Sequence, residues 1–157
     1  MTNKEIKIAY QEFDSLDELE AKDKELAEAA IEATIGSYAP YSNFNVGAAV
    51  MLEGNEIIKG SNQENAAFPS GICAERTALF YASASRPGVP MKAIAIAAMQ
   101  NGELCQNPVT PCGACRQVMS QYQLKSGIPM NIILIGSEKI WKFTKVEDLL
   151  PFIFDSI

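Results

Sequence analysis

The chain has 157 residues, of which 48% are apolar and 20% are charged, proportions typical of a globular domain with a sizeable core. Its net charge is −6 and it contains no histidine, so we expect no nucleic-acid partner, which would require clustered lysine and arginine, and no histidine metal ligand. The longest apolar run, residues 93–99, falls far short of the roughly 20 residues that span a bilayer, and the N-terminus lacks the apolar core of a signal peptide, so we expect a cytoplasmic protein with no membrane partner.

The first third of the sequence predicts an arm, a helix and a hairpin. Residues 6–13 fit a short extended arm. Ser15 and Glu18 have the spacing of a capping box, which predicts a helix that begins there and ends near Gly36. Two strands follow, at residues 46–52 and 56–60, and residues 53–55 form the turn between them.

The remainder alternates helix and strand. Residues 74–83 and 112–124 have helical composition, whereas 91–99 and 130–136 are apolar runs typical of strands buried on both faces. This order indicates a right-handed parallel crossover, and a short helical turn is expected in the tail, at residues 146–150. No linker or repeat divides the chain, so we predict one α/β domain over residues 1–157, with a mixed sheet covered by helices on both faces.

Two short cysteine motifs carry the chemistry. Cys112 and Cys115 stand three apart at a predicted helix start, where both sulfurs can face one ion, and Cys73 precedes the other helix. Three thiolates leave one position of a tetrahedral zinc open for water, which is the arrangement of a catalytic site. Glu75 follows the first cysteine by two residues and is placed to move that water's protons.

Other interpretations of the same residues remain open at this point. The C-x-x-C pair is also compatible with a redox pair, or with a structural four-cysteine zinc site completed by Cys105, although catalytic zinc accounts best for the first motif. Arg76 and Arg116 each follow a motif cysteine. They could donate to the sulfurs and offset their negative charge, a role that we favour more for Arg76, or they could be ordinary surface residues.

Several segments resemble one known family. Residues 73–78 and 111–117 are similar to the signature of the small three-cysteine cytidine deaminases, which are zinc hydrolases acting on nucleosides. Residues 38–49 resemble the family's first-strand motif, 62–66 its ribose-binding segment, and 149–154 its C-terminal tail. The resemblance extends in order from about Leu26 to Phe154.

This resemblance implies a fold, a reaction and an assembly. The fold would be a three-layer α/β/α arrangement with a mixed five-stranded sheet. One zinc ion per chain would be held by Cys73, Cys112 and Cys115, with Glu75 as the proton shuttle and Arg76 beside the sulfurs. The expected reaction is hydrolytic deamination of cytidine and 2′-deoxycytidine in pyrimidine salvage, by a homotetramer whose active sites are shared between subunits.

The resemblance also implies substrate contacts. Asn62 and Glu64 would hold the 3′ side of the ribose, although alone they would be taken for a turn residue and a solvated acid. Phe44 would pack against the nucleoside, and Phe154 in the tail would reach the base in a neighbouring subunit. The backbone N–H of Ala74 and the backbone carbonyl of Thr110 would form hydrogen bonds to the base.

The sequence departs from the family pattern in three places. Phe68-Pro69 stands where a Tyr-Gly type of step is usual, Thr110 replaces a common serine, and residues 1–20 form an N-terminal extension. Three alternative functions are a deaminase of a modified nucleoside or antibiotic base, a non-catalytic zinc-stabilised interaction domain, and an editing deaminase of polynucleotides. The acidic charge disfavours the last of these.

Overall fold

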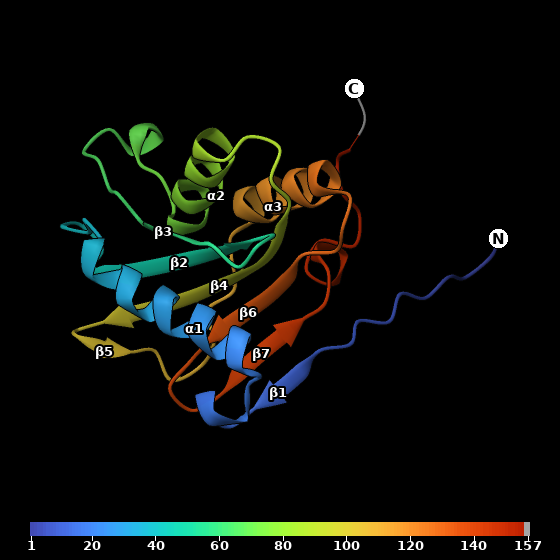
Figure 1. Ribbon diagram of the computed structural model, residues 1–157, viewed down its shortest axis with the longest axis horizontal. Helices are drawn as coiled ribbons and strands as arrows, with labels where there is room; N and C mark the ends of the chain where they lie inside the picture. Colours follow the sequence, from blue (N-terminus) through green and yellow to red (C-terminus); the bar gives the residue numbers. More distant parts are fainter. Residues whose placement is uncertain (156–157) are drawn as a thin grey trace.

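The computed structural model describes residues 1–155, which form one mixed sheet between two layers of helices (Figure 1). The strands are β1 (Gln11–Phe13), β2 (Phe44–Leu52), β3 (Ile57–Ser61), β4 (Met91–Gln100), β5 (Glu103–Leu104), β6 (Asn131–Ile135) and β7 (Ile140–Phe143). The helices are α1 (Ala21–Ala33), α2 (Ala74–Ser85) and α3 (Gly113–Ser126), with 3₁₀ turns η1 (Leu16–Glu18), η2 (Thr34–Gly36), η3 (Phe68–Ser70) and η4 (Val146–Asp148).

The sheet has the strand order β1-β7-β6-β4-β2-β3, and β5 pairs with β4. The β4–β6 pair is parallel, as the strand–helix–strand pattern predicts, and the other pairs are antiparallel. The α/β fold and the mixed sheet are therefore confirmed, but the expected number of five strands is wrong. The structure has seven strands, of which β5 and β7 were not recognised in the sequence, because a two-residue strand and a four-residue strand behind tight turns leave too short a pattern.

The central strands are buried on both faces, and alternate side chains enter different cores. Ile94 and Ile96 of β4 pack toward α2 and α3, whereas Ala93, Ala95 and Ala97 pack toward α1. The strands β2 and β6 alternate in the same way. This period of two explains why the strands are continuous apolar runs, and it places α1 on one face and α2 with α3 on the other (Figure 1).

The capping-box prediction is wrong. Ser15 makes no side-chain capping bond, and residues 16–18 form only a single 3₁₀ turn. The carboxylate of Glu18 accepts instead from the backbone N–H of Asp14, at 3.0 Å. The α1 helix begins at Ala21, with Glu20 at the N-cap, and its end near Gly36 agrees with the prediction.

Close packing sets the height of α2 above the sheet. A Cβ atom added at Gly60 of β3 would lie 2.4 Å from the backbone nitrogen of Ala78 in α2, which is closer than atoms can approach. The absence of a side chain at Gly60 therefore lets the helix lie directly on β3. This contact fixes the position of α2, which has Cys73 at its N-cap and Glu75 in its first turn.

Among residues 1–155, no helix combines the length and apolarity needed to cross a bilayer.

Candidate metal centre and active site

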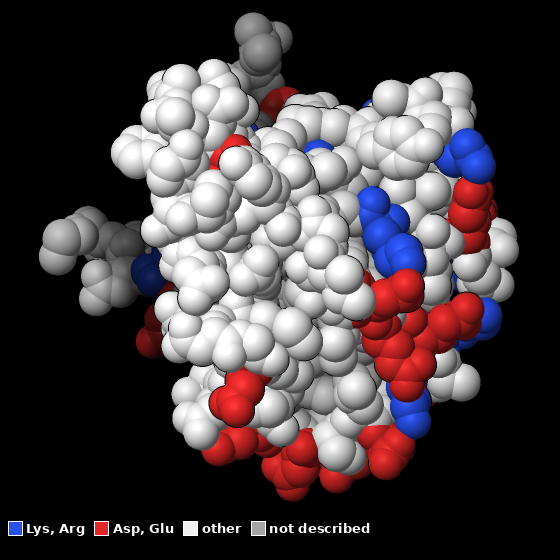
Figure 2. Space-filling view, turned by 90° about the vertical axis from the view of Figure 1, so that its left-hand side faces the viewer, with Lys and Arg blue, Asp and Glu red and all other residues white. Residues whose placement is uncertain are grey.

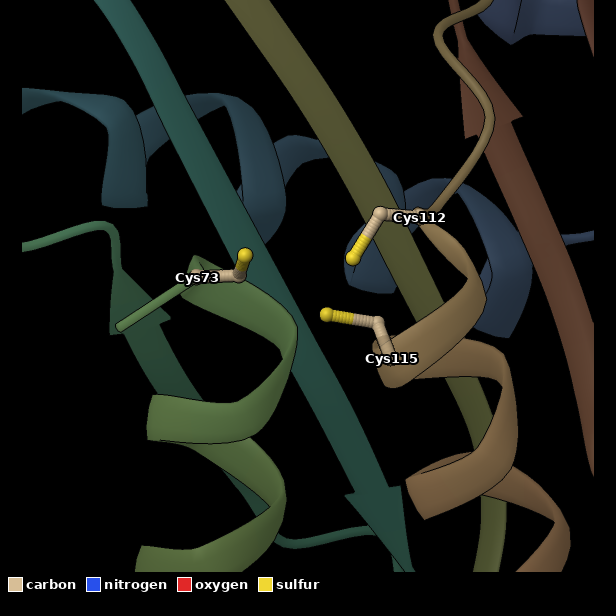
Figure 3. A group of neighbouring side chains, drawn as sticks. All are labelled: Cys73, Cys112 and Cys115. Carbon is tan, nitrogen blue, oxygen red and sulfur yellow. The ribbon is translucent and has the colours of Figure 1, made fainter. Parts of the chain in front are cut away.

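Three cysteine sulfurs meet where two helices begin. Cys73 is the N-cap residue of α2, Cys112 is the N-cap residue of α3, and Cys115 lies in the first turn of α3. Their Sγ atoms all lie within 4.8 Å of one another, and Figure 3 shows the three side chains pointing toward a common centre. Both helix N-termini direct unpaired N–H groups and partial positive charge toward this point, which favours thiolates.

The topology explains this convergence. The α2 helix leads into β4 and α3 leads into β6, and these two strands are parallel neighbours. Each helix runs antiparallel to the strand that follows it. Because the two strands are parallel, both helices begin at the same end of the sheet, beside the carboxyl ends of the strands. Cys73 and the other two cysteines, although separated by almost forty residues, are brought together by this crossover.

The three sulfurs fit a zinc ion. Thiolates bound to one tetrahedral zinc at about 2.3 Å lie about 3.8 Å apart, so a small contraction of the cluster would satisfy the geometry. The Cys115 thiol donates to Cys73, and this hydrogen bond, with help from Arg76, lowers the pKa of Cys73 to about 5. The pKa of Cys115 is raised, because Cys115 donates to Cys73 and is desolvated. Zinc binds cysteines as thiolates, so metal binding would release the protons that these thiols still carry.

Cys105 is not part of the cluster. Within residues 1–155, the group of possible ligand atoms consists of the three sulfurs of Cys73, Cys112 and Cys115. The structural four-cysteine interpretation needs Cys105 as its last ligand and is therefore not supported. A three-thiolate site keeps one zinc position open, as catalysis requires.

Arg76 contacts the sulfurs and Arg116 does not. Arg76 Nη2 donates to Cys73 Sγ at 3.6 Å, while its buried Nε has no hydrogen-bond partner among the residues described. Arg116 instead donates to the carbonyls of Pro111 and Leu149, each at 2.8 Å, and so joins the loop before Cys112 to the C-terminal tail. Of the two arginines, Arg76 is therefore the one that contacts a sulfur of the cluster.

Glu75 is buried beside the cluster. It is the second residue of α2 and only 5% exposed. Burial raises the pKa of its carboxyl group, and the negative charge of Cys73 adds to the rise, against opposing hydrogen bonds from its own backbone N–H and from Cys115. A carboxyl group with a raised pKa holds a proton more readily than an exposed one, so it can both accept and donate protons.

A cavity of about 470 Å³ opens next to Cys73 and Arg76. Asn62 and Glu64, which follow the end of β3, line it, as do aromatic side chains at its rim. Its size lies within the range of small-molecule sites. Residues that line the cavity but received no individual role from the sequence are Tyr41, Ser42, Gln63, Asn65, Gly71 and Ile72.

The polar atoms of Asn62 are mostly used within the protein. Its Oδ1 accepts from the Ser37 hydroxyl at 2.6 Å and from the Val46 backbone N–H at 2.8 Å. Its Nδ2 donates to the Phe44 carbonyl at 2.9 Å. One N–H of the amide remains for a ligand.

Glu64 is held by the loop before β2. The backbone N–H groups of Tyr41 and Ser42 donate to its Oε2 at 2.8 and 3.3 Å, and the Ser42 hydroxyl donates to its Oε1. The Ser42 hydroxyl bond is the main cause that lowers the pKa of Glu64 below its ordinary value. The carboxylate is therefore ionised at neutral pH and still has lone pairs for a ligand.

The other predicted substrate contacts are not part of the cavity wall. Phe44 begins β2 and is half-buried, Ala74 begins α2 and is fully buried, and Thr110 is exposed in the loop before Cys112. Phe154 is 68% exposed, and its carbonyl accepts from the Gln117 side chain at 2.7 Å. In a single chain these four residues are not among those that line the cavity.

Taken chemically, the arrangement is that of a zinc-dependent hydrolase. The metal would have an open position, the buried carboxyl group can transfer protons, and the neighbouring cavity supplies polar groups for a small molecule. Similarity to known proteins supports the same class of enzyme.

Residues 20–129 match the family model described as the cytidine and deoxycytidylate deaminase zinc-binding region. A cytidine deaminase of Halalkalibacterium halodurans is 47% identical over 97 residues, which cover 61% of this chain and 68% of that protein. One from Sporosarcina psychrophila is 42% identical over 116 residues, covering 73% and 78%. This chain belongs to the cytidine and deoxycytidylate deaminase family.

Solved structures agree with this assignment. The crystal structure of cytidine deaminase from Burkholderia pseudomallei matches with a TM-score of 0.68 and 40% identity, covering 83% of this chain and 97% of that one. The structure from Mycobacterium tuberculosis matches with a TM-score of 0.67 and 29% identity, covering 87% and 100%. These matches cover most of this chain and nearly all of the solved chains.

Proposed function

We propose that this chain catalyses the zinc-dependent hydrolysis of the C4 amino group of cytidine and 2′-deoxycytidine, giving uridine or 2′-deoxyuridine and ammonia. The observation that carries the proposal is the three-thiolate cluster with Glu75 buried beside it, in a chain of this family. The relatives named above are cytidine deaminases, which supports the same substrate for this chain.

The three cysteines hold the metal, and Arg76 moderates its charge. A zinc ion bound by Cys73, Cys112 and Cys115 would acidify a water molecule and make it a nucleophile at neutral pH. Three thiolates give the centre a formal charge of −1, which weakens that effect. The guanidinium group of Arg76 at Cys73 Sγ offsets part of this charge.

Glu75 moves the protons. Its carboxylate accepts a proton from the attacking water and delivers it to N3 of the cytosine ring, which makes C4 more electrophilic. It then takes the remaining proton from the hydroxyl group added at C4 and delivers it to the amino group, so that the C4–N bond breaks, the C4 carbonyl forms and ammonia leaves. The backbone N–H of Ala74 would donate to O2 of the base, and the backbone carbonyl of Thr110 would accept from the amino group, so that C4 faces the nucleophile.

Asn62 and Glu64 provide complementary groups for a sugar hydroxyl. The free N–H of Asn62 can donate to the 3′-oxygen, while the Glu64 carboxylate can accept the hydroxyl proton. Phe44 would pack against the nucleoside. These contacts suit a free nucleoside with an ordinary ribose or deoxyribose, and they favour it over a base without its sugar.

The proposal includes a homotetramer whose sites are shared. Phe154, exposed in the tail, would reach the base held by a neighbouring subunit. Figure 2 shows a face on which uncharged side chains cover most of the area and acidic ones gather toward the lower part. Between the end of α1 and η3, the large apolar side chains that are exposed are Ile35, Tyr38, Tyr41 and Phe68. Exposed apolar side chains of this kind suit contact between subunits. A cytoplasmic role in pyrimidine salvage completes the proposal.

The decisive experiment couples an absorbance assay of cytidine conversion with ammonia and metal analysis of the same sample. We expect about one zinc per chain and one ammonia for each uridine formed. A panel including 2′-deoxycytidine, cytosine and modified cytidines tests the substrate class. Bound zinc without turnover of any cytosine nucleoside would contradict the proposal and favour a non-catalytic zinc domain.

A further inference from the structure

We infer that Ser37 and Ser42 are positioning residues that determine which atoms of Asn62 and Glu64 face the cavity, and thereby make the site selective for a nucleoside with a 3′-hydroxyl. The inference rests on the proposed function and adds two residues to it. Neither serine needs to touch the substrate, since each acts through the side chain to which it donates.

The direction of the Ser42 hydroxyl is fixed by its surroundings. The backbone N–H of Phe44 donates to Ser42 Oγ at 3.1 Å, so that oxygen already has a donor facing it. The single hydroxyl hydrogen then points to Glu64 Oε1. With the backbone N–H groups of Tyr41 and Ser42 on Oε2, both carboxylate oxygens of Glu64 are anchored in one orientation.

The same arrangement recurs at Ser37. Asn45 Nδ2 donates to Ser37 Oγ at 3.1 Å, and the hydroxyl hydrogen of Ser37 is thereby directed to Asn62 Oδ1 at 2.6 Å. Val46 N–H donates to the same Oδ1. Two donors facing one amide oxygen exclude the flipped amide, which would place an NH₂ group against them.

The two anchored side chains present opposite hydrogen-bonding characters to the cavity. Asn62 offers its remaining N–H as a donor, and Glu64 offers carboxylate lone pairs as acceptors. A hydroxyl group both accepts and donates, so it satisfies both residues at once. A nucleoside without the 3′-hydroxyl leaves the Asn62 donor and the charged Glu64 acceptor unpaired. Unpaired polar groups weaken binding strongly, so a site of this kind rejects the analogue effectively.

The test compares cytidine with 3′-deoxycytidine in the full-length zinc enzyme. In Ser37→Ala and Ser42→Ala we expect the KM for cytidine to rise by about 3- to 10-fold, while kcat changes by less than about 2-fold. Kinetics with 3′-deoxycytidine should change little, so the preference for cytidine falls by the same factor. Ser42→Thr keeps a hydroxyl group and should recover most of the preference. Ser137→Ala, an exposed serine in the turn before β7, is the matched control and should behave as wild type.

Each outcome has a separate meaning. Equal losses for cytidine and 3′-deoxycytidine, or loss of zinc in the serine variants, would show a general structural role and overturn the inference while leaving the proposed function intact. Wild-type enzyme that binds zinc but releases no ammonia from cytidine would overturn the proposed function, and the inference with it.

Discussion

At the scale of single residues, the chemistry depends on a carboxyl group that the fold keeps out of water. Glu75 projects from the first turn of α2 and has almost no solvent exposure. Burial of this group raises its pKa, whereas Glu64, held by a hydroxyl and two backbone N–H groups, has a lowered pKa. Two glutamates eleven residues apart are thus prepared for different tasks, one for proton transfer and one for binding as a permanent acceptor.

Replacing Glu75 should separate turnover from metal binding. We expect Glu75→Gln to retain one zinc per chain and the wild-type melting temperature within a few degrees, while kcat for cytidine falls by about 10²- to 10⁴-fold, because an amide cannot accept and return the proton. Zinc analysis, thermal unfolding and the absorbance assay on one preparation would test this. Near-normal turnover would remove Glu75 from the mechanism.

The choice of metal ligands gives a second residue-level prediction, with a built-in comparison. Cys112→Ser should lower zinc content well below one per chain and abolish activity, since a hydroxyl group is a poor replacement for a thiolate ligand. Cys105→Ser should change neither, because Cys105 lies outside the cluster. If the two variants lost zinc equally, the four-cysteine interpretation would have to be reinstated.

At the scale of elements, one buried side chain connects three segments around α3. Gln123 Oε1 accepts from the backbone N–H groups of Met130 and Val146, at 3.0 and 2.9 Å, and its Nε2 donates to Glu147 at 2.9 Å. These bonds fasten α3 to the entry of β6 and to η4. They satisfy two backbone donors that would otherwise be buried without partners.

Removing that side chain should be costly for stability. We expect Gln123→Ala to lower the free energy of unfolding by about 2–4 kcal/mol, because two buried N–H groups lose their acceptor. Gln121→Ala, an exposed position on the same helix, should change it by less than about 0.5 kcal/mol. Urea unfolding measures both, and equal values for the two variants would show that water or another group replaces the lost acceptor.

The elements also show which parts of the fold a sequence can specify. Strands β2, β3, β4 and β6, together with α2 and α3, were predicted within a few residues, since long apolar runs and helical composition are strong local signals. The start of α1 was misplaced because Ser15 and Glu18 match a capping pattern whose bonds do not form in the tertiary structure. β7 depends on pairing with β6 and β1, which a four-residue segment does not reveal.

At the scale of the whole molecule, the proposed function implies that one chain alone does not form a complete active site. Phe154 lies at the surface, outside the cavity of its own chain. The family match begins at residue 20, and we propose that the residues before it form an extension to the common domain. Part of this extension, β1, pairs with β7 at the edge of the sheet.

The proposed tetramer predicts a particle of about four times the 17.1 kDa of one chain. Light scattering of the purified zinc protein would measure it, with dilution to test dissociation. A monomer with full activity would contradict sharing of sites.

Mixed assemblies would test sharing directly. Glu75→Gln chains lack the proton shuttle but carry Phe154, whereas Phe154→Ala chains carry Glu75 but lack the aromatic ring. If the ring serves a neighbour, co-expression of the two should restore sites that contain both groups, and kcat/KM should exceed the sum of the separately expressed variants. No gain would place Phe154 in its own subunit or outside the site.

The types of metal ligand and the family can be inferred from local features of the sequence. The absence of histidine and the spacing of Cys112 and Cys115 are local facts, because residues three apart at a helix start share a face. Two further features emerge from the folded chain: Cys73 joins the other cysteines through the parallel β4–β6 crossover, and Asn62 offers a donor and not an acceptor to the cavity. Both outcomes depend on partners distant in sequence, whose hydrogen bonds and packing exist only once the chain has folded.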